Sequence, residues 1–280
     1  MSPRKLKNYT FMAACFGCAL FGLVILASVL YSLIGKGLAG FGLHLFTEIT
    51  PGPGSNGGLK NAIIGSLMLT ALSIVIATPL GVLAGTWLSE SEKSSKAAEA
   101  LRFLNGMLMS APSILVGLFV YKVIVVTTGG FSGWAGTVAL AILALPIIVS
   151  TTEEMLRLVP TTLKEAGSGL GVSRWRVMTQ LCYRAAGPGI MTGILLSMAR
   201  ITGETAPLLF TALNSNFMTT DMSQPMANLP VTIYQYAMSP YESWNELAWA
   251  GALLITVFIL IINLLATALP RWIKALRAAK

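Results

Sequence analysis

The chain has 280 residues, of which 55% are hydrophobic and only 11% are charged. Because a soluble domain carries about 25% charged residues, this composition excludes an ordinary soluble protein and indicates several membrane spans. Three cysteines and one histidine cannot build a disulfide scaffold and leave few ligands for a metal site, so we predict none.

Six apolar runs follow one another along the chain, each long enough for a membrane-spanning helix of about 20 residues. Polar or Gly/Pro-rich stretches separate them, the longest polar one being residues 153–184. We therefore predict an all-α polytopic membrane protein with six transmembrane helices. The runs cover residues 8–35, 61–89, 103–121, 134–152, 185–212 and 247–270.

Basic residues are distributed unevenly between the two sides that six spans define. Fifteen of them precede the first run, lie in the second or fourth connection, or follow the last run, whereas the opposite side has only Lys36 and Lys60. The positive-inside rule then places both termini and the 153–184 segment in the cytoplasm. The net charge of +8 is thus a topology signal, and we expect no nucleic-acid partner.

The fifth run contains a charged pair, Arg200 and Glu204, in the stretch MARITGETAPLLFTA. At 1.5 Å per residue, Arg200 lies about 18 Å along a helix from Pro188, near mid-membrane. A centred Arg costs roughly 2.5–3.5 kcal/mol on insertion scales, and an i,i+4 ion pair recovers only about 0.2–0.5 kcal/mol in water. The pair should therefore face a water-filled path or a protein interior, where a structural ion pair to a partner subunit is the alternative.

Polar groups follow the charged pair along the same predicted helix. Pro207 lacks an N–H, so we expect the carbonyl of Gly203 to lose its helical donor. The hydroxyls of Thr202 and Thr205 would add polarity there.

The 153–184 segment predicts a short helix, a glycine corner and a second helix. Thr162-x-x-Glu165 has the pattern of a capping box, Gly171 can take the left-handed conformation that ends a helix, and Ser173 can cap the next helix. The small residues of EAGSGLG would let another protein approach closely, which indicates a docking surface.

EAGSGLG, followed by Leu181 ten positions after Gly171, resembles the EAA loop of ABC importer permeases. In that family the loop forms a coupling helix that fits a groove on a cytoplasmic ATPase. The resemblance implies ATPase coupling for Glu165, Ala166, Gly167 and Gly171, with Gly167 standing where the family has a second Ala.

Four further stretches resemble the PstA-type permease subunit of phosphate importers. The resemblance implies a type I ABC importer permease fold, with an N-terminal helix and outer loop (1–60), a permease domain (61–270) and a cytoplasmic tail (271–280). Ser150 stands where many relatives carry Arg. The stretches are APSILVGLF (111–119), LALPIIVSTTEEMLRLVP (143–160), MARITGETAPLLFTA (198–212) and QPMANLPVTIYQYAMSP (224–240).

The resemblance also implies a function and partners. The chain would be a non-catalytic permease subunit of an ATP-driven inorganic phosphate importer in the bacterial inner membrane, with both termini cytoplasmic. Its partners would be a PstC-type permease, two PstB-type ATPases, a PstS-type phosphate-binding protein and a possible phosphate-signalling regulator. The sequence has no G-x-x-x-x-G-K-[ST] motif, so ATP and Mg²⁺ would be used by the ATPase and this chain would bind no cofactor.

Under this interpretation, Arg200, Glu204 and Thr205 belong to the translocation pathway. A guanidinium presents a planar fork of donors that suits two phosphate oxygens, and Glu204 would share the Arg and weaken its grip. A permease for another oxyanion, such as sulfate or molybdate, and a phosphate-signalling scaffold remain alternatives. No H-E-x-x-H motif or close Asp cluster supports a membrane-embedded enzyme.

Overall fold

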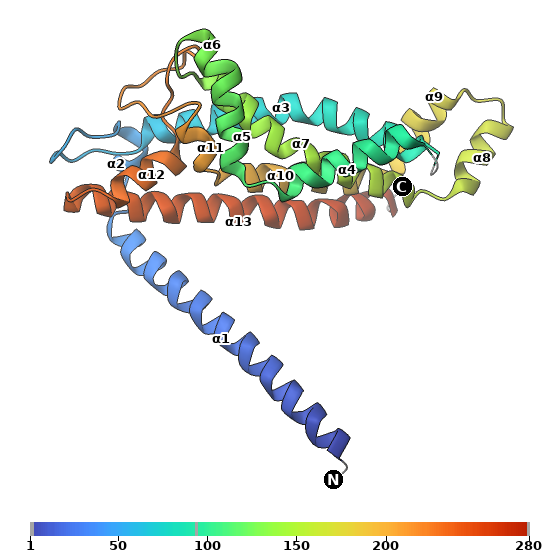
Figure 1. The fold of residues 1–280 in the computed structure, drawn as a ribbon, viewed down its shortest axis with the longest axis horizontal. Helices are drawn as coiled ribbons and strands as arrows, with labels where there is room; N and C mark the ends of the chain where they lie inside the picture. The colour runs from blue at the N-terminus through green and yellow to red at the C-terminus, as the bar shows by residue number, and fades with distance from the viewer. Residues whose placement is uncertain (1–2, 93–94, 279–280) are drawn as a thin grey trace.

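The computed structural model describes residues 3–92 and 95–278, where all regular structure is helical (Figure 1). The helices lie mostly along one direction, with α13 running the length of the body. We call the end with α8 and α9 the α8 end, and the opposite end, with α2 and α12, the α12 end. The elements are α1 (Pro3–Ala39), α2 (His44–Thr47), α3 (Lys60–Glu90), α4 (Lys96–Ser110), α5 (Ser113–Val120), the π-helical turn η1 (Tyr121–Val125), α6 (Val126–Thr128), α7 (Gly133–Arg157), α8 (Thr161–Gly169), α9 (Arg174–Arg176), the π-helical turn η2 (Val177–Cys182), α10 (Tyr183–Thr202), α11 (Ala206–Leu209), α12 (Leu229–Ala237) and α13 (Glu242–Ala278).

The all-helical fold is confirmed, but the count of six spans is not. Four helices of the described chain are long and apolar enough to cross a membrane alone: α1, α3, α7 and α13. A fifth span results if the bent pair α4 and α5 is taken as one. α10 has 20 residues but does not reach this level of apolarity, since it includes Arg184 and Arg200.

The third predicted span lies in a pair of helices with a sharp bend between them. The axes of the segments Lys96–Ser110 and Ser113–Thr128 differ by 103°. Pro112 explains the break, because proline disfavours the helical conformation of the residue before it, and Ala111 is extended (φ −67°, ψ 135°). The bend turns α5 away from α4 and brings it against α11, where Pro207 packs on Gly117.

The core of the body is the contact between α3 and α7. Glycines allow it: a Cβ on Gly81 would lie 2.7 Å from the Ile148 side chain, and one on Gly85 would lie 2.6 Å from the Val149 carbonyl oxygen. A hydrogen bond crosses the same interface, since the Ser73 hydroxyl lies 2.9 Å from the Thr137 carbonyl oxygen. The other long helices are arranged around this pair.

Polar side chains close the α12 end. Asn61, at the start of α3, accepts from the Thr50 amide (2.9 Å) and donates to the Thr50 hydroxyl (2.8 Å) and the Ser215 carbonyl (3.0 Å). Tyr236 of α12 stacks on Trp244 of α13, with ring centroids 4.4 Å apart. Burial raises the pKa of the Tyr236 phenol, which therefore stays protonated. These contacts fix the loop before α3 and the loop between α11 and α12, and they hold α12 against α13.

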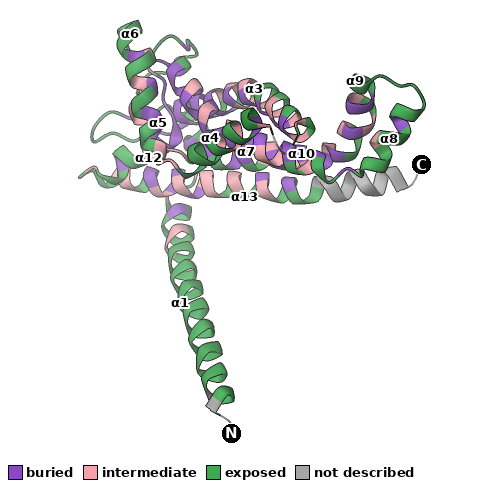
Figure 2. Ribbon diagram, turned by 45° about the vertical axis from the view of Figure 1, so that its right-hand side comes forward, coloured by how far each residue is buried: buried purple, intermediate pink, exposed green. Residues whose placement is uncertain are grey.

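α1 departs from the body, and its surface is exposed along nearly its whole described length (Figure 2). Its contact with the body lies at its C-terminal end, where Gly37 and Gly40 approach α13. There Lys36 lies over the Trp249 ring, 4.9 Å from its centroid. An apolar helix with no protein cover is suited to a lipid environment.

We predict that Gly85→Val destabilises the protein by about 1–3 kcal/mol, because the new side chain would force α7 away from α3. Gly106→Val on α4 is the matched control, since nothing lies within 4 Å of a Cβ built there. The measurement is the melting temperature of each purified variant in detergent. Equal melting temperatures for the two variants would contradict the packing argument.

Candidate translocation and coupling sites

Arg200 lies in the last turn of α10, which packs against both α7 and α13. The guanidinium remains accessible, with 43% of the side chain exposed, whereas the Glu204 side chain is 18% exposed. A charged side chain inside a membrane-spanning bundle is expected to face water or protein rather than lipid. Its position at the C-terminal end of α10 also favours a cation, because unpaired carbonyls there carry partial negative charge.

The helix that carries Arg200 ends sooner than the sequence indicated. α10 stops at Thr202, Gly203 is not helical (φ −96°, ψ 3°), and α11 starts afresh at Ala206. The expectation that Pro207 removes a donor from Gly203 within one continuous helix is therefore wrong. Gly203 weakens the helix, and Pro207 sits in the first turn of α11, where its missing N–H costs nothing.

Arg200 and Glu204 come together across this break. The distance from Arg200 Nε to Glu204 Oε1 is 4.0 Å, which is longer than a hydrogen bond of about 2.7–3.2 Å. The carboxylate thus reduces the field of the guanidinium without holding its N–H groups in place. Arg200 and Glu204 therefore form an ion pair without a hydrogen bond.

The threonines near the pair have different surroundings. The Thr202 hydroxyl donates to the Met198 carbonyl of its own helix at 2.7 Å, so its proton is used within α10. Thr205 is half-buried and directly precedes α11. Pro207, two residues later, accepts a hydrogen bond from the Thr211 hydroxyl through its carbonyl oxygen. The membership of Thr205 in the pathway stays a prediction.

The glycine corner of the 153–184 segment has the predicted form. Gly171 has a left-handed backbone conformation, with φ +74°. Its amide donates to the Ser168 carbonyl oxygen at 3.0 Å, and the Val172 amide donates to the Gly167 carbonyl oxygen at 3.3 Å. These two bonds form the Schellman motif that ends a helix at a left-handed glycine. Gly167 is buried, and a Cβ there would lie 3.0 Å from Leu181 and Val177.

The predicted helix caps of this segment are wrong in detail. α8 begins at Thr161 after Pro160, so Thr162 lies inside the helix and forms no capping box. Pro160 fixes the backbone dihedral φ before α8 and so defines where the helix begins, without a side-chain cap. Ser173 does precede α9, but its side chain makes no cap bond, and the chain runs on through η2 into α10. Glu165 and Ala166 are exposed on α8, as a docking surface requires.

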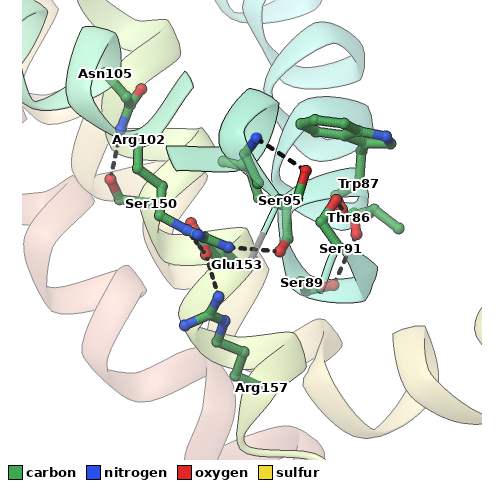
Figure 3. A network of polar contacts seen from close by, with 12 residues as sticks. Thr86, Trp87, Ser89, Ser91, Ser95, Arg102, Asn105, Ser150, Glu153 and Arg157 are labelled. Atoms are coloured by element: carbon green, nitrogen blue, oxygen red, sulfur yellow. Dashed lines mark hydrogen bonds and ion pairs between the residues drawn. The ribbon is translucent and has the colours of Figure 1, made fainter. Parts of the chain in front are cut away.

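A charged network near the α8 end was not identified from the sequence (Figure 3). Glu153 on α7 is nearly buried and pairs with Arg102 of α4 at 2.8 Å and with Arg157 at 2.9 Å. Arg102 also donates to the Leu88 carbonyl near the end of α3 at 3.1 Å. The network joins α3, α4 and α7, and the spacing of Glu153 and Arg157 was the one local signal for it.

Ser150 lies one turn from this network and has a partner on α4. The Asn105 amide nitrogen lies 2.8 Å from the Ser150 hydroxyl (Figure 3), and it also lies 3.3 Å from the Pro146 carbonyl oxygen. Polar groups therefore follow the contact of α4 with α7. Among the residues that the structure describes, no group of three or more His, Cys, Asp or Glu side chains could hold a metal ion.

Comparison with known proteins assigns the chain to a protein family. Residues 77–275 match the family model of the binding-protein-dependent transport system inner membrane component. A phosphate transport system permease protein PstA from Pasteurella multocida (strain Pm70) is 54% identical over 263 residues, which are 94% of each chain. The chain belongs to the PstA-type permeases of this family. Another PstA, from Haemophilus influenzae, is 52% identical over 93% of each chain.

Solved structures show the fold of this family. A permease of a bacterial alginate ABC transporter has a TM-score of 0.66 at 15% identity and covers 96% of this chain and 99% of its own. The MetNI methionine ABC transporter, in inward-facing conformations, gives 0.62 at 19% identity and covers 75% of this chain and 93% of its own. The fold is that of a type I ABC importer permease, an integral membrane protein.

We predict that Gly171→Ala loosens the end of α8. A left-handed conformation costs an L-residue roughly 1–2 kcal/mol, so amides 166–172 should exchange about 5–30 times faster with solvent. Gly169→Ala is the matched control, since Gly169 lies within the helix and has open space around it. Hydrogen-exchange mass spectrometry measures both, and equal exchange in the two variants would contradict the role given to Gly171.

Proposed function

We propose that this chain is the membrane-spanning permease subunit of an ATP-driven inorganic phosphate importer. It forms half of the translocation pathway and couples that half to a separate ATPase. The observation that carries the proposal is an accessible guanidinium, that of Arg200, in the final turn of a membrane helix within a PstA-type chain. The relatives' names supply phosphate as the substrate.

Arg200 and Glu204 are the proposed transient phosphate site. A guanidinium stays charged at all physiological pH values and can donate two parallel hydrogen bonds to phosphate oxygens. The 4.0 Å separation from Glu204 lowers the local potential without occupying those donors. Release is then faster than from an isolated Arg, as a pathway requires. Thr205, just beyond Glu204, is the proposed neighbouring hydroxyl.

The segment from α8 to η2 is the proposed ATPase-docking element. It presents Glu165 and Ala166 together with two large apolar side chains, Leu170 at 83% exposure and Trp175 at 69%. Exposed aromatic and apolar residues of this kind are typical anchors of protein interfaces. Gly171 between them sets the direction of the two anchors.

The remaining partners follow from the same proposal. A PstC-type permease completes the pathway, two PstB-type ATPases bind at the α8 end, and a PstS-type protein delivers phosphate at the α12 end. The chain lies in the bacterial inner membrane with the α8 end and both termini in the cytoplasm, in line with the excess of basic residues on that side. ATP and Mg²⁺ bind to the ATPase, and this chain is non-catalytic.

For phosphate uptake we predict a strong dependence on Arg200. In vesicles that contain the complete transporter, Arg200→Gln should lower ATP-driven uptake about tenfold or more, because a charge-assisted hydrogen bond of about 1.5–3 kcal/mol is lost. Arg200→Lys should recover part of the rate, since it keeps the charge and loses the fork. Labelled phosphate uptake is the measurement, with sulfate and molybdate as competitors.

Lys60→Gln is the control for this experiment, because it removes one positive charge at the start of α3, at the α12 end. Co-purification of the partner subunits shows that each variant still assembles. Wild-type uptake by Arg200→Gln and Arg200→Lys in assembled complexes would exclude the transport role and favour a structural ion pair. Uptake of sulfate or molybdate in place of phosphate would exclude the proposed substrate.

For ATPase docking we predict that Leu170→Ala with Trp175→Ala weakens assembly. A Trp that acts as an interface hot spot contributes about 2 kcal/mol or more, so the ATPase should be lost during affinity purification when Trp175 and Leu170 are both truncated. Met238→Ala is the control, since Met238 is equally exposed (74%) but lies after α12 at the opposite end. Full retention of the ATPase by the double variant would place the docking surface elsewhere.

A further inference from the structure

Helix α8 is held at two places of different character. One is apolar, where Gly167 of α8 packs against Val177 and Leu181 of η2. The other is ionic, where Lys164 Nζ of α8 lies 2.5 Å from Glu90 Oε1. Glu90 is the last residue of α3, so this contact joins α8 to a helix that is remote in sequence.

The ion pair spans an open corner. A hollow of about 220 Å³ lies between the end of α3, α8 and η2, and its lining includes Glu90, Lys164, Glu165, Arg174 and Cys182. The two acidic and two basic side chains give the hollow no net formal charge. Here α3 and α8 are connected by opposite charges rather than by a packed apolar interface. Such a connection lets a displacement of α8 move α3 while α8 can still rotate.

The end of α3 is also connected to the rest of the body. The Thr86 hydroxyl, one turn before Glu90, lies 2.8 Å from the Tyr183 hydroxyl at the start of α10. Upstream, α3 packs closely on α7 at Gly81 and Gly85. A displacement of α8 that reaches Glu90 therefore acts on the α3–α7 core directly, without passing through α9 and η2.

We infer that the Glu90–Lys164 ion pair is a coupling contact, which carries the movement of the docking element to α3. This inference rests on the proposed function. Both side chains are partly exposed, at 38% for Glu90 and 25% for Lys164. Partly exposed ion pairs add little to stability, so the pair positions α8 relative to α3 and does not hold the fold together.

The test is the number of phosphate ions imported per ATP hydrolysed by the complete transporter in proteoliposomes. Glu90→Gln and Lys164→Gln should each lower this ratio about threefold, within the range that one exposed ion pair can account for. Melting temperature and the amount of bound ATPase should stay unchanged. The reversed pair, Glu90→Lys with Lys164→Glu, should restore the ratio, because it recreates the attraction and keeps the hollow neutral.

Glu92→Gln and Lys96→Gln are matched controls, since they remove the same charges from exposed neighbouring positions. A wild-type ratio in both Gln variants at positions 90 and 164 would overturn the inference, and so would a reversed pair that stays as uncoupled as the single variants. Failure of the wild-type complex to import any phosphate would instead overturn the proposed function, and this inference with it. The two failures are therefore distinguishable.

Discussion

The close contact of α3 with α7 is the constraint on which the other elements depend. Gly81 and Gly85 bring the two helices together at distances that a Cβ would not allow. α7 then offers its other sides to α10, α4 and α5, and the end of α3 reaches both α8 and α10. Because side-chain packing is dense and lacks slack, a shift of α3 is transmitted to several elements at once.

Charged side chains within this frame are placed where they have a partner or access to water. Glu153 lies between two arginines near the α8 end, and Arg200 lies beside Glu204 at a helix end. The two groups differ in geometry. Glu153 makes contacts of hydrogen-bond length that fix α4 to α7, whereas Glu204 stands 4.0 Å from Arg200 and leaves its donors available. The first arrangement suits a structural link, and the second belongs to the site proposed above for phosphate.

Breaks in helices place these groups. Pro112 turns α5 away from α4, and Gly203 with Pro207 ends α10 and starts α11. The two broken segments meet where Gly117 of α5 packs on Pro207 of α11. In a membrane, non-helical backbone is tolerated where protein or water can satisfy its polar groups. The two breaks therefore lie close to a contact that is buried in protein, at Gly117 and Pro207.

The sequence by itself determined the helical class, the apolar runs and the left-handed corner at Gly171, and it identified Arg200 as a candidate site residue. It could do so because composition, periodicity and glycine conformation are local properties. It predicted six spans and a continuous fifth helix, since a run of apolar residues records no bend such as that at Pro112. Only the tertiary structure brought Glu90 to Lys164 and Arg102 to Glu153. These partners are far apart in the chain, and their pairing depends on how α3, α4, α7 and α8 pack in space.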